Sequence, residues 1–208
     1  QTDGLVFYID AAYKKSYPGD GSTWTDIINN SVGTITNATF DSSGYFDFDG
    51  AGDRIDFVPN SNLNFGTENW TVSCWARQDV TGVDGFFRRV WMMDGPTGNN
   101  VNNPQLAIVP GEYGTEGTPN PWSGGGLDIA DGSVLMLNAW RNIVVVRNGS
   151  TVTSYTDGSV NGTPDTSIGS MNLDNLNNPG GPRVRLGSYD NINGNLGGQI
   201  SSIQMYNR

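Results

Sequence analysis

Two β-runs meet within residues 140–162, which read WRNIVVVRNGSTVTSYTDGSVNG. The dipeptide Asn148-Gly149 lies between them. Asn-Gly between apolar runs is a strong hairpin signal, because a two-residue loop with positive φ at both positions matches the twist of paired strands. Asp157-Gly158 supplies a second turn of this kind. The chain is therefore expected to be built from hairpins.

The rest of the chain repeats this pattern of short apolar runs separated by Gly, Asn, Asp and Pro. Helical periodicity is nearly absent, and only Trp24–Ile28 is expected to form a helical turn. About a dozen short strands are typical of a β-sandwich or barrel, so the sequence predicts an all-β fold. The expected strands are Leu5–Asp10, Thr34–Thr39, Tyr45–Asp49, Arg54–Val58, Trp70–Arg77, Phe86–Met93, Gln105–Val109, Gly126–Ile129, Ile143–Arg147, Thr151–Thr156, Arg183–Ser188 and Gln199–Tyr206.

The composition limits both the architecture and the partners. An all-β sandwich of 208 residues is ordinarily one unit, so residues 1–208 are expected to form a single domain. A net charge of -10, from 21 acidic against 11 basic residues, disfavours nucleic acid as a partner and leaves cations, neutral glycans or basic protein surfaces. No apolar run approaches the roughly 20 residues that span a bilayer, so no membrane insertion is expected.

Strand alternation predicts which large side chains are buried. Cys74 is in phase with the inward residues of its strand and is expected to be a small buried hydrophobe rather than a reactive thiol. Trp75 is out of phase and is expected on the open face of a sheet. Arg88 and Arg89 predict a small basic patch, which either docks on the acidic surface of a second copy or has one arginine simply solvated. The core is expected to contain Trp24, Trp70, Trp91 and Trp140.

Several segments, taken in order, carry a family resemblance. The chain opens with Gly4-Leu-Val-Phe-Tyr-Ile-Asp-Ala11, continues with Phe46-Asp-Phe-Asp-Gly50 and Trp70-Thr-Val-Ser-Cys-Trp75, and closes with Gly198-Gln-Ile-Ser-Ser-Ile-Gln-Met-Tyr-Asn-Arg208. This order resembles the LamG-like (laminin G-like, concanavalin A-like) domain family over nearly the whole chain. The resemblance implies a concanavalin A-like jelly-roll β-sandwich of two antiparallel sheets. Such modules include glycan lectins, adhesive parts of secreted enzymes and decoration proteins of virus particles, so the fold alone does not fix the role.

Catalysis is not expected, and no residue is assigned a catalytic role. The chain has no histidine, which removes the commonest general base and the commonest transition-metal ligand. Retaining glucanases of this fold need two carboxylates about 5–5.5 Å apart on a strand, and no such glutamate motif is present. Asp47 and Asp49 share one strand face and are the alternative carboxylate pair, but solvated outward acids on an amphipathic strand explain their spacing without chemistry.

Candidate ligand-binding residues lie in two long loops rich in Gly, Pro and Asn. Aromatic rings in such loops can serve as platforms for the apolar face of a sugar, and these rings are Tyr113, Trp122 and Tyr189. The alternative for Trp122 is that it plugs the end of the core.

The resemblance also implies cation ligands at one end of the sandwich, here Asp53, Asp190 and Asn191. Calcium is the expected metal, because it takes about six to eight oxygen ligands and this chain is rich in Asp and Asn. The alternative is that these side chains cap turns through hydrogen bonds to nearby backbone.

These observations lead to one functional hypothesis and two alternatives. The chain is expected to be a non-catalytic attachment module, extracellular or on a virion surface, displayed in multiple copies and binding cell-surface or extracellular glycans with calcium. The first alternative is a purely structural virion decoration or filament subunit, whose partners are assembly or capsid proteins. The second is a glucanase-type glycoside hydrolase.

Overall fold

The computed structural model describes residues 3–79, 88–94, 104–109, 118–123, 138–166, 183–188 and 194–208. A 3₁₀ turn, η1, spans Ser61–Leu63. The strands of these ranges are β1(Leu5–Asp10), β2(Thr23–Thr25), β3(Val32–Thr36), β4(Thr39–Asp41), β5(Tyr45–Asp49), β6(Arg54–Phe57), β7(Trp70–Gln78), β8(Arg88–Asp94), β9(Pro104–Val109), β10(Thr118–Ser123), β11(Arg141–Asn148), β12(Thr151–Thr156), β13(Ser159–Asp165), β14(Arg183–Leu186) and β15(Gly197–Tyr206).

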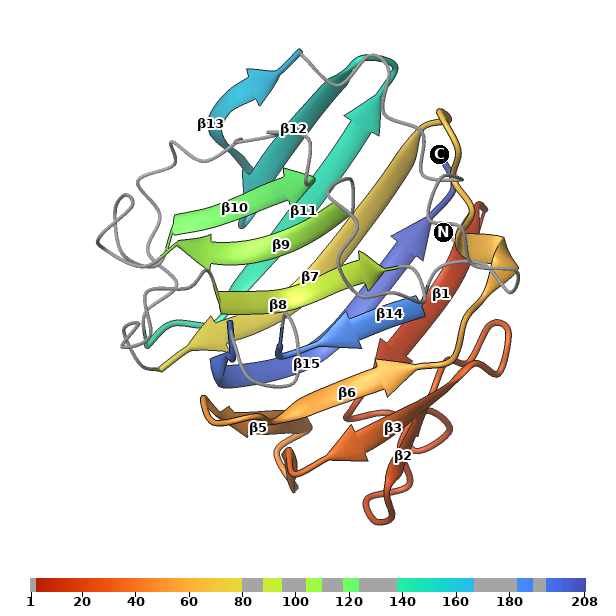
Figure 1. The fold of residues 1–208 in the computed structure, drawn as a ribbon, viewed down its shortest axis with the longest axis vertical. Helices are drawn as coiled ribbons and strands as arrows, with labels where there is room; N and C mark the ends of the chain where they lie inside the picture. The colour runs from red at the N-terminus through yellow and green to blue at the C-terminus, as the bar shows by residue number, and fades with distance from the viewer. Residues whose placement is uncertain are drawn as a thin grey trace.

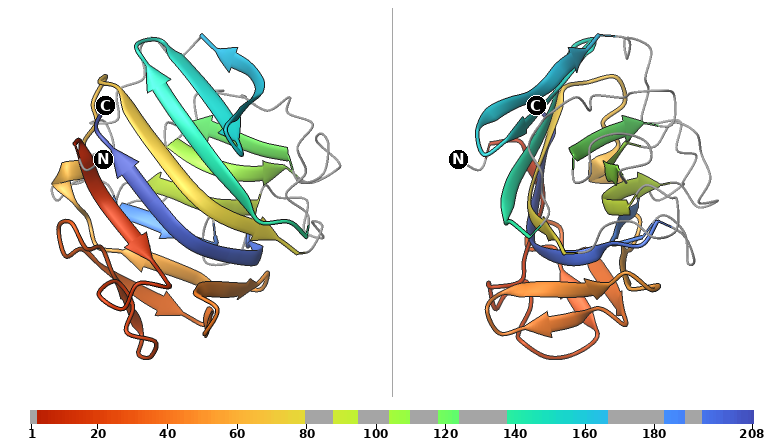
Figure 2. Two further views of the ribbon diagram at one scale, coloured as in Figure 1. Left: turned by 180° about the vertical axis from the view of Figure 1, so that it is seen from behind. Right: turned by 90° about the vertical axis from the view of Figure 1, so that its left-hand side faces the viewer.

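The described strands form two antiparallel sheets that face each other (Figures 1 and 2). One sheet has eight strands in the order β13-β12-β11-β7-β15-β5-β4, with β1 paired to β15. The other has seven strands in the order β10-β9-β8-β14-β6-β3-β2. The prediction of an all-β, concanavalin A-like jelly-roll sandwich is confirmed.

Strand β15 organises the eight-stranded sheet. It pairs with β7 along most of its length, with β1 near its end and with β5 near its start. The register with β7 shifts between Ile200 and Ser202, so Ser201 is an extra residue at a β-bulge. The backbone carbonyl of Ser201 accepts a hydrogen bond from the Ala11 amide at 2.9 Å. Several segments distant in sequence thus converge on the start of this strand.

The hairpin between β11 and β12 is confirmed, but its turn lies one residue later than predicted. Asn148 pairs with Thr151 as the last rung of the ladder, so the loop is Gly149-Ser150. Gly149 has a φ of 61°, and Asn148 is not among the residues with positive φ. Two hydrogen bonds hold Gly149 in the first loop position: its amide donates to Asn69 Oδ1 at 2.8 Å, and its carbonyl accepts from Arg147 Nε at 3.1 Å. The following turn, Asp157-Gly158, has positive φ at both residues, as predicted.

Some predicted elements differ from the structure. The expected helical turn at Trp24–Ile28 is wrong, because Thr23–Thr25 pairs with β3 as strand β2. Strands β4 and β13 were not expected, and β10 forms within a segment that the sequence indicated as a loop. The expected strand Gly126–Ile129 lies outside the described residues.

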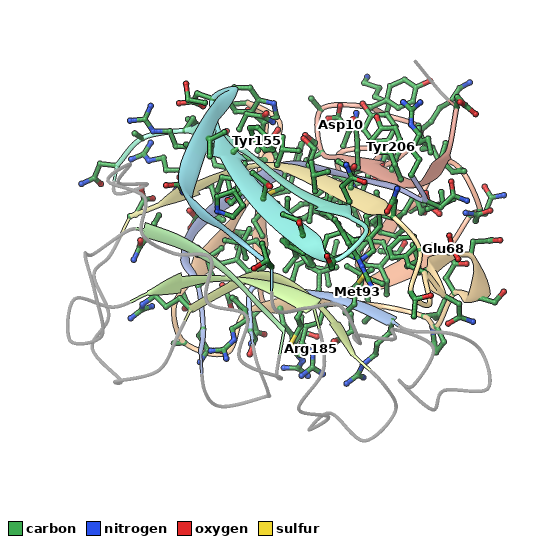
Figure 3. The ribbon with its side chains drawn as sticks, turned by 90° about the horizontal axis from the view of Figure 1, so that it is seen from above. Asp10, Glu68, Met93, Tyr155, Arg185 and Tyr206 are labelled. Atoms are coloured by element: carbon green, nitrogen blue, oxygen red, sulfur yellow. The ribbon has the colours of Figure 1, made fainter. Side chains whose placement is uncertain are left out.

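Side chains from both sheets fill the space between them. In Figure 3, Met93 lies between the layers, Tyr155 and Tyr206 lie beyond the eight-stranded sheet, and Arg185 lies beyond the seven-stranded one. Trp24 packs against Phe46 with ring centroids 4.7 Å apart, and Phe7 meets Phe57 edge-to-face at 5.1 Å. Aromatic contacts of this kind add about 0.5–1.5 kcal/mol each beyond the area that they bury.

Cys74 and three of the four tryptophans predicted for the core are buried. Burial raises the pKa of the Cys74 thiol to about 12, which confirms an inert structural cysteine. The prediction for the fourth tryptophan, Trp140, is wrong, because it is only half-buried and lies on the outer face of the sheet.

The prediction for Arg88 and Arg89 is also wrong. They are 2% and 3% exposed, so neither forms a solvated patch. Arg88 Nη1 donates a hydrogen bond to the backbone carbonyl of Asn195 at 2.7 Å. A buried guanidinium needs such partners, since an unpaired charge away from water is costly. Of the helical turns in the described ranges, none has the length or the apolar character to cross a membrane.

Candidate functional site

The outer face of the eight-stranded sheet carries a groove of about 290 Å³. Strand β7 supplies its most exposed ring. The inward residues of β7, Cys74 and Ala76 among them, are buried, which turns Trp75 to the opposite face with 45% of its surface exposed. The prediction that Trp75 lines the open face of a sheet is confirmed. The groove is lined by Ser43, Gly44, Tyr45, Trp75, Trp140 and Ser201.

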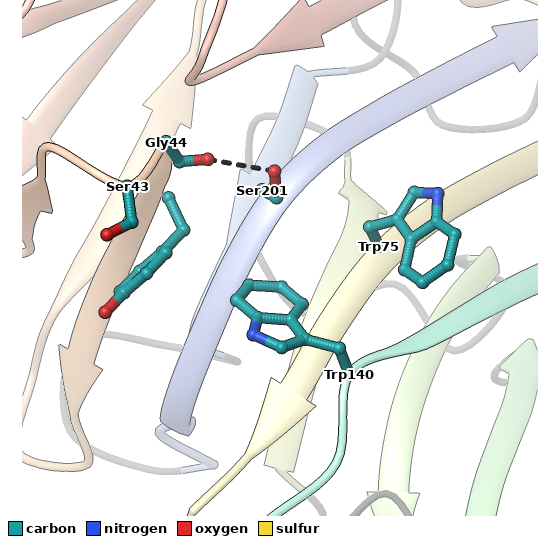
Figure 4. A pocket seen from close by; sticks show the side chains of 6 residues that line it. Ser43, Gly44, Trp75, Trp140 and Ser201 are labelled. Carbon is teal, nitrogen blue, oxygen red and sulfur yellow. Dashed lines mark hydrogen bonds between the residues drawn. The ribbon is translucent and has the colours of Figure 1, made fainter.

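A second indole lies beside the first. Trp140 comes directly before β11, after a turn in which Asn138 takes a φ of 57° and donates its amide to the Gln78 carbonyl at 2.7 Å. Its ring packs against Tyr45 at the start of β5, with centroids 5.5 Å apart. Figure 4 shows Trp140 between Trp75 and the turn that carries Ser43 and Gly44. The two indoles therefore offer apolar surface on one side of the sheet.

The polar edge of the groove comes from a tight turn and a bulge. Gly44 has a φ of 93°, and a Cβ at this position would meet Ala12 Cβ at 2.7 Å, so no other residue fits without movement. The Gly44 carbonyl accepts a hydrogen bond from Ser201 Oγ at 2.9 Å (Figure 4). Asp41 Oδ1 accepts from the Ser43 amide at 2.7 Å and fixes the turn. Hydroxyl and carbonyl oxygens thus border the aromatic rings.

Charged residues border the groove, but none of them lines it. The hydrogen bond from the Ser43 amide lowers the pKa of Asp41 below its ordinary value. The pKa of Tyr45 is raised, first by burial and then by the negative charge of Asp41, with a smaller contribution from Asp47. Tyr45 therefore stays neutral at all ordinary pH values, and the groove presents uncharged groups.

The candidate carboxylate pair has other partners. Asp47 and Asp49 do face outward together, as predicted from strand alternation. Asp47 Oδ1 accepts a hydrogen bond from Gln199 Nε2 at 2.7 Å, and Gln199 also donates to Asp79. Asp49 Oδ1 accepts from the Ala51 amide at 2.7 Å. Asp47 is therefore engaged by a neighbouring side chain, and Asp49 stabilises the turn that follows β5.

Asp53, the described member of the predicted cation site, makes the turn contact that was the alternative. It is 4% exposed, and its Oδ2 accepts a hydrogen bond from the Asp49 amide at 2.9 Å. Burial raises the pKa of its carboxyl. Within the described ranges, no three acidic, Cys or His side chains gather in a way that could hold a metal. One carboxylate already bound to an amide does not by itself fit calcium, which needs about six to eight oxygens.

The other predicted site residues lie wholly or partly outside the described part of the chain. Tyr113, Tyr189, Asp190 and Asn191 lie outside the described residues. Trp122 lies in β10, where its backbone pairs with Gln105, but its side chain is outside the described part.

Most of the groove does not follow from sequence patterns. The strand-like context of Trp140 predicts a core residue, and Ser201 carries no signal of its own. One indication was available: Tyr45 is in phase with the outward Asp47 rather than with the buried Phe46. Its outward orientation could have been predicted, but its contact with Trp140 could not.

Comparison with protein families and curated proteins gives one match. The family model described as "Concanavalin A-like lectin/glucanases superfamily" matches residues 48–208. The search of curated proteins found no match.

Several solved structures share the fold. Trypanosoma rangeli sialidase, in complex with the inhibitor DANA, has a TM-score of 0.72 at 15% identity, and the match covers 100% of this chain and 31% of the sialidase. The binding domain of botulinum neurotoxin serotype D has a TM-score of 0.62 at 14% identity, covering 100% of this chain and 49% of that domain. At such identities the likeness shows the fold alone, and this chain spans about a third of the sialidase.

A third structure matches over nearly its whole length. Domain 4 of AbnA, a GH43 extracellular arabinanase from Geobacillus stearothermophilus, was solved in complex with arabinotriose. Its TM-score is 0.62 at 16% identity, and the match covers 97% of this chain and 91% of that domain.

Proposed function

Because this chain belongs to the concanavalin A-like lectin/glucanase superfamily, we propose that it is a non-catalytic carbohydrate-binding module. The observation that carries this proposal is the groove in which Trp75 and Trp140 lie beside serine hydroxyls and a backbone carbonyl. Aromatic rings cover the apolar C–H face of a pyranose, while neutral oxygens address its hydroxyl groups. The groove combines both features.

Three further observations support binding rather than catalysis. The chain has no histidine. Asp41 and Asp47, the two acids whose charges raise the pKa of Tyr45 in the groove, already accept hydrogen bonds from Ser43 and Gln199. A similar fold occurs in a domain solved with arabinotriose and in a toxin segment described as a binding domain.

The proposal extends to the biological setting. We place the module outside the cell, on a virion surface or a secreted assembly, where copies attach to cell-surface or extracellular glycans. An acidic chain with only 15% charged residues and abundant small polar ones suits repeated display, because like copies repel one another and stay dispersed.

Affinity gel electrophoresis and a glycan array test the proposal. The wild-type chain should be retarded by at least one neutral polysaccharide, and Trp75→Ala and Trp140→Ala should abolish the retardation. Val58→Ser is the matched surface control, because Val58 is 52% exposed and follows β6 of the other sheet. Its retardation should equal that of the wild type.

Two outcomes would point elsewhere. No binding to any glycan, together with ordered oligomers seen by microscopy, would favour a structural decoration subunit. Release of reducing sugar from laminarin or agar by the purified chain would favour a glucanase.

Calcium remains a separate proposal at Asp53, Asp190 and Asn191. If these residues hold calcium, Asp53 would contribute to the site from the turn after β5, where its carboxylate accepts the Asp49 amide. The groove itself lies on a different set of residues, so its binding should not depend on calcium.

A further inference from the structure

We propose that the groove selects neutral pyranose oligosaccharides and rejects sugars that carry a carboxylate, such as uronic and sialic acids. This inference rests on the proposed carbohydrate-binding function and adds the class of ligand. It comes from the charge of the groove and its border rather than from the fold.

The lining has no group that could neutralise an anion. Its side chains are two indoles, a phenol and two serine hydroxyls, with the Gly44 carbonyl beside them. Carboxylates in proteins are bound chiefly by charged donors such as arginine or by clusters of N–H groups. A carbonyl oxygen pointing toward a bound carboxylate would repel it, whereas a sugar hydroxyl can donate a hydrogen bond to the same oxygen.

The border of the groove adds negative charge. Asp41 pairs with Tyr45 across β4 and β5, and Asp47 lies on the same outward face of β5 as Tyr45. The negative charges of both acids raise the pKa of Tyr45, and the positive charge of Arg77 lowers it by a smaller amount. Arg77 is itself paired with Asp79, at 2.6 Å between Nε and Oδ1.

The remaining features suit hydroxyl groups. Ser201 Oγ uses its single proton in the hydrogen bond to Gly44, so its free lone pairs can accept from a ligand. Trp75 is 45% exposed and available for stacking. A neutral ring with C–H and O–H groups therefore matches the groove, whereas a carboxylate in the same place has no cationic side chain in the lining to offset its charge.

The experiment compares matched polysaccharides that differ in charge. Affinity electrophoresis is run with polygalacturonate and with its methyl-esterified, neutral form, and titrations follow with N-acetyllactosamine and its α2,3-sialylated form. We expect the neutral member of each pair to bind at least about tenfold more tightly at low salt. Repulsion between partly solvated like charges changes affinity by about this factor. The preference should narrow at high salt, because screening acts over about 10 Å at 0.1 M.

Two conservative variants test whether Asp41 and Asp47 cause the discrimination against anionic sugars. Asp41→Asn and Asp47→Asn keep an oxygen for the hydrogen bonds from Ser43 and Gln199 but remove the charge. They should leave affinity for the neutral sugars within about twofold and reduce discrimination against the anionic ones.

The possible results separate the two proposals. Binding of the anionic member as tightly as the neutral one, with loss of both in Trp75→Ala, would overturn the charge selection and leave the carbohydrate-binding function standing. No binding of either member would overturn the proposed function and this inference with it. Discrimination that is unchanged in both Asn variants would overturn the role assigned to the two acids.

Discussion

The indole of Trp140 packs against the phenol ring of Tyr45, with ring centroids 5.5 Å apart and planes inclined at 58°. Trp140 precedes β11 and Tyr45 begins β5, and the sheet order places β7 and β15 between these strands. The pair therefore bridges the two central strands on their outer face. It creates an aromatic floor that neither segment has alone, beside the exposed ring of Trp75.

Trp75→Ala should separate binding from stability. The ring is 45% exposed and faces away from the core, so its removal should change the free energy of unfolding by less than about 1 kcal/mol. Trp140→Ala also removes a ring pair and should cost about 1–2 kcal/mol. Urea denaturation measures both, and glycan affinity should be lost in both variants. A large destabilisation by Trp75→Ala would mean that the ring has a structural role instead.

Gly44→Ala should damage the polar edge of the groove. The φ of 93° disfavours any side chain, and the new Cβ would lie 2.7 Å from Ala12 Cβ, so we expect a loss of about 1–3 kcal/mol in unfolding free energy. The Gly149→Ala variant is a control with positive φ but open space around it. It should cost less, because it carries the backbone strain without the clash. Equal losses would show that the contact with Ala12 is unimportant.

The fold was predictable because its signals are local. Strand alternation at Leu5–Asp10, Tyr45–Asp49 and Thr151–Thr156 gave the observed bounds, since one face of each strand must be buried. The turn at Gly149 could not be placed to the residue. Its position depends on hydrogen bonds from the Gly149 amide to Asn69 and from Arg147 to the Gly149 carbonyl, and Asn69 lies far away in the sequence.

The groove was much less predictable than the fold. Trp75 could be assigned to an open face from its phase alone. The role of Trp140 depends on where the chain before β11 crosses the sheet, and that of Ser201 on a bulge in β15. Bulges and loop paths are set by tertiary contacts, which periodicity does not report. The burial of Arg88 could not be predicted for the same reason, since its partner Asn195 comes from a distant segment.

Binding to the groove should be independent of pH from about 6 to 9. Tyr45 is the titratable group in the lining, and burial and the charge of Asp41 raise its pKa above the ordinary 10.0. The folded state therefore holds this proton more tightly than the unfolded state. As pH rises above 10.0 the unfolded phenol ionises first, so stability falls with rising pH until the folded phenol ionises as well. Isothermal titration across this range, with Tyr45→Phe as control, checks the prediction, and a transition near pH 7 would contradict it.

Calcium binding at Asp53 would appear as a rise in melting temperature. A ligand that binds only the folded state stabilises it according to its concentration relative to Kd, so millimolar calcium should raise Tm and a chelator should reverse the rise. Asp53→Asn keeps an oxygen for the Asp49 amide while removing the charge, and it should abolish the calcium effect. Without calcium this variant should be as stable as the wild type or slightly more so, because the buried carboxylate has a raised pKa. An unchanged Tm on adding calcium to the wild type would exclude the site.

Asn69 should protect Asn148 from deamidation. Asn-Gly sequences lose ammonia when the glycine amide nitrogen attacks the asparagine side-chain carbonyl to form a cyclic imide, which water then opens. In this chain the Gly149 amide donates to Asn69 Oδ1 at 2.8 Å, so the attacking nitrogen would first have to give up this hydrogen bond. Asn69→Ala should therefore speed deamidation at Asn148 several-fold, as followed by peptide mass spectrometry during incubation at mildly alkaline pH. Asn69→Asp retains the acceptor oxygen and should deamidate like the wild type. Equal rates in the alanine variant and the wild type would show that the strand pairing of Asn148 with Thr151, rather than the hydrogen bond from the Gly149 amide to Asn69, protects the site.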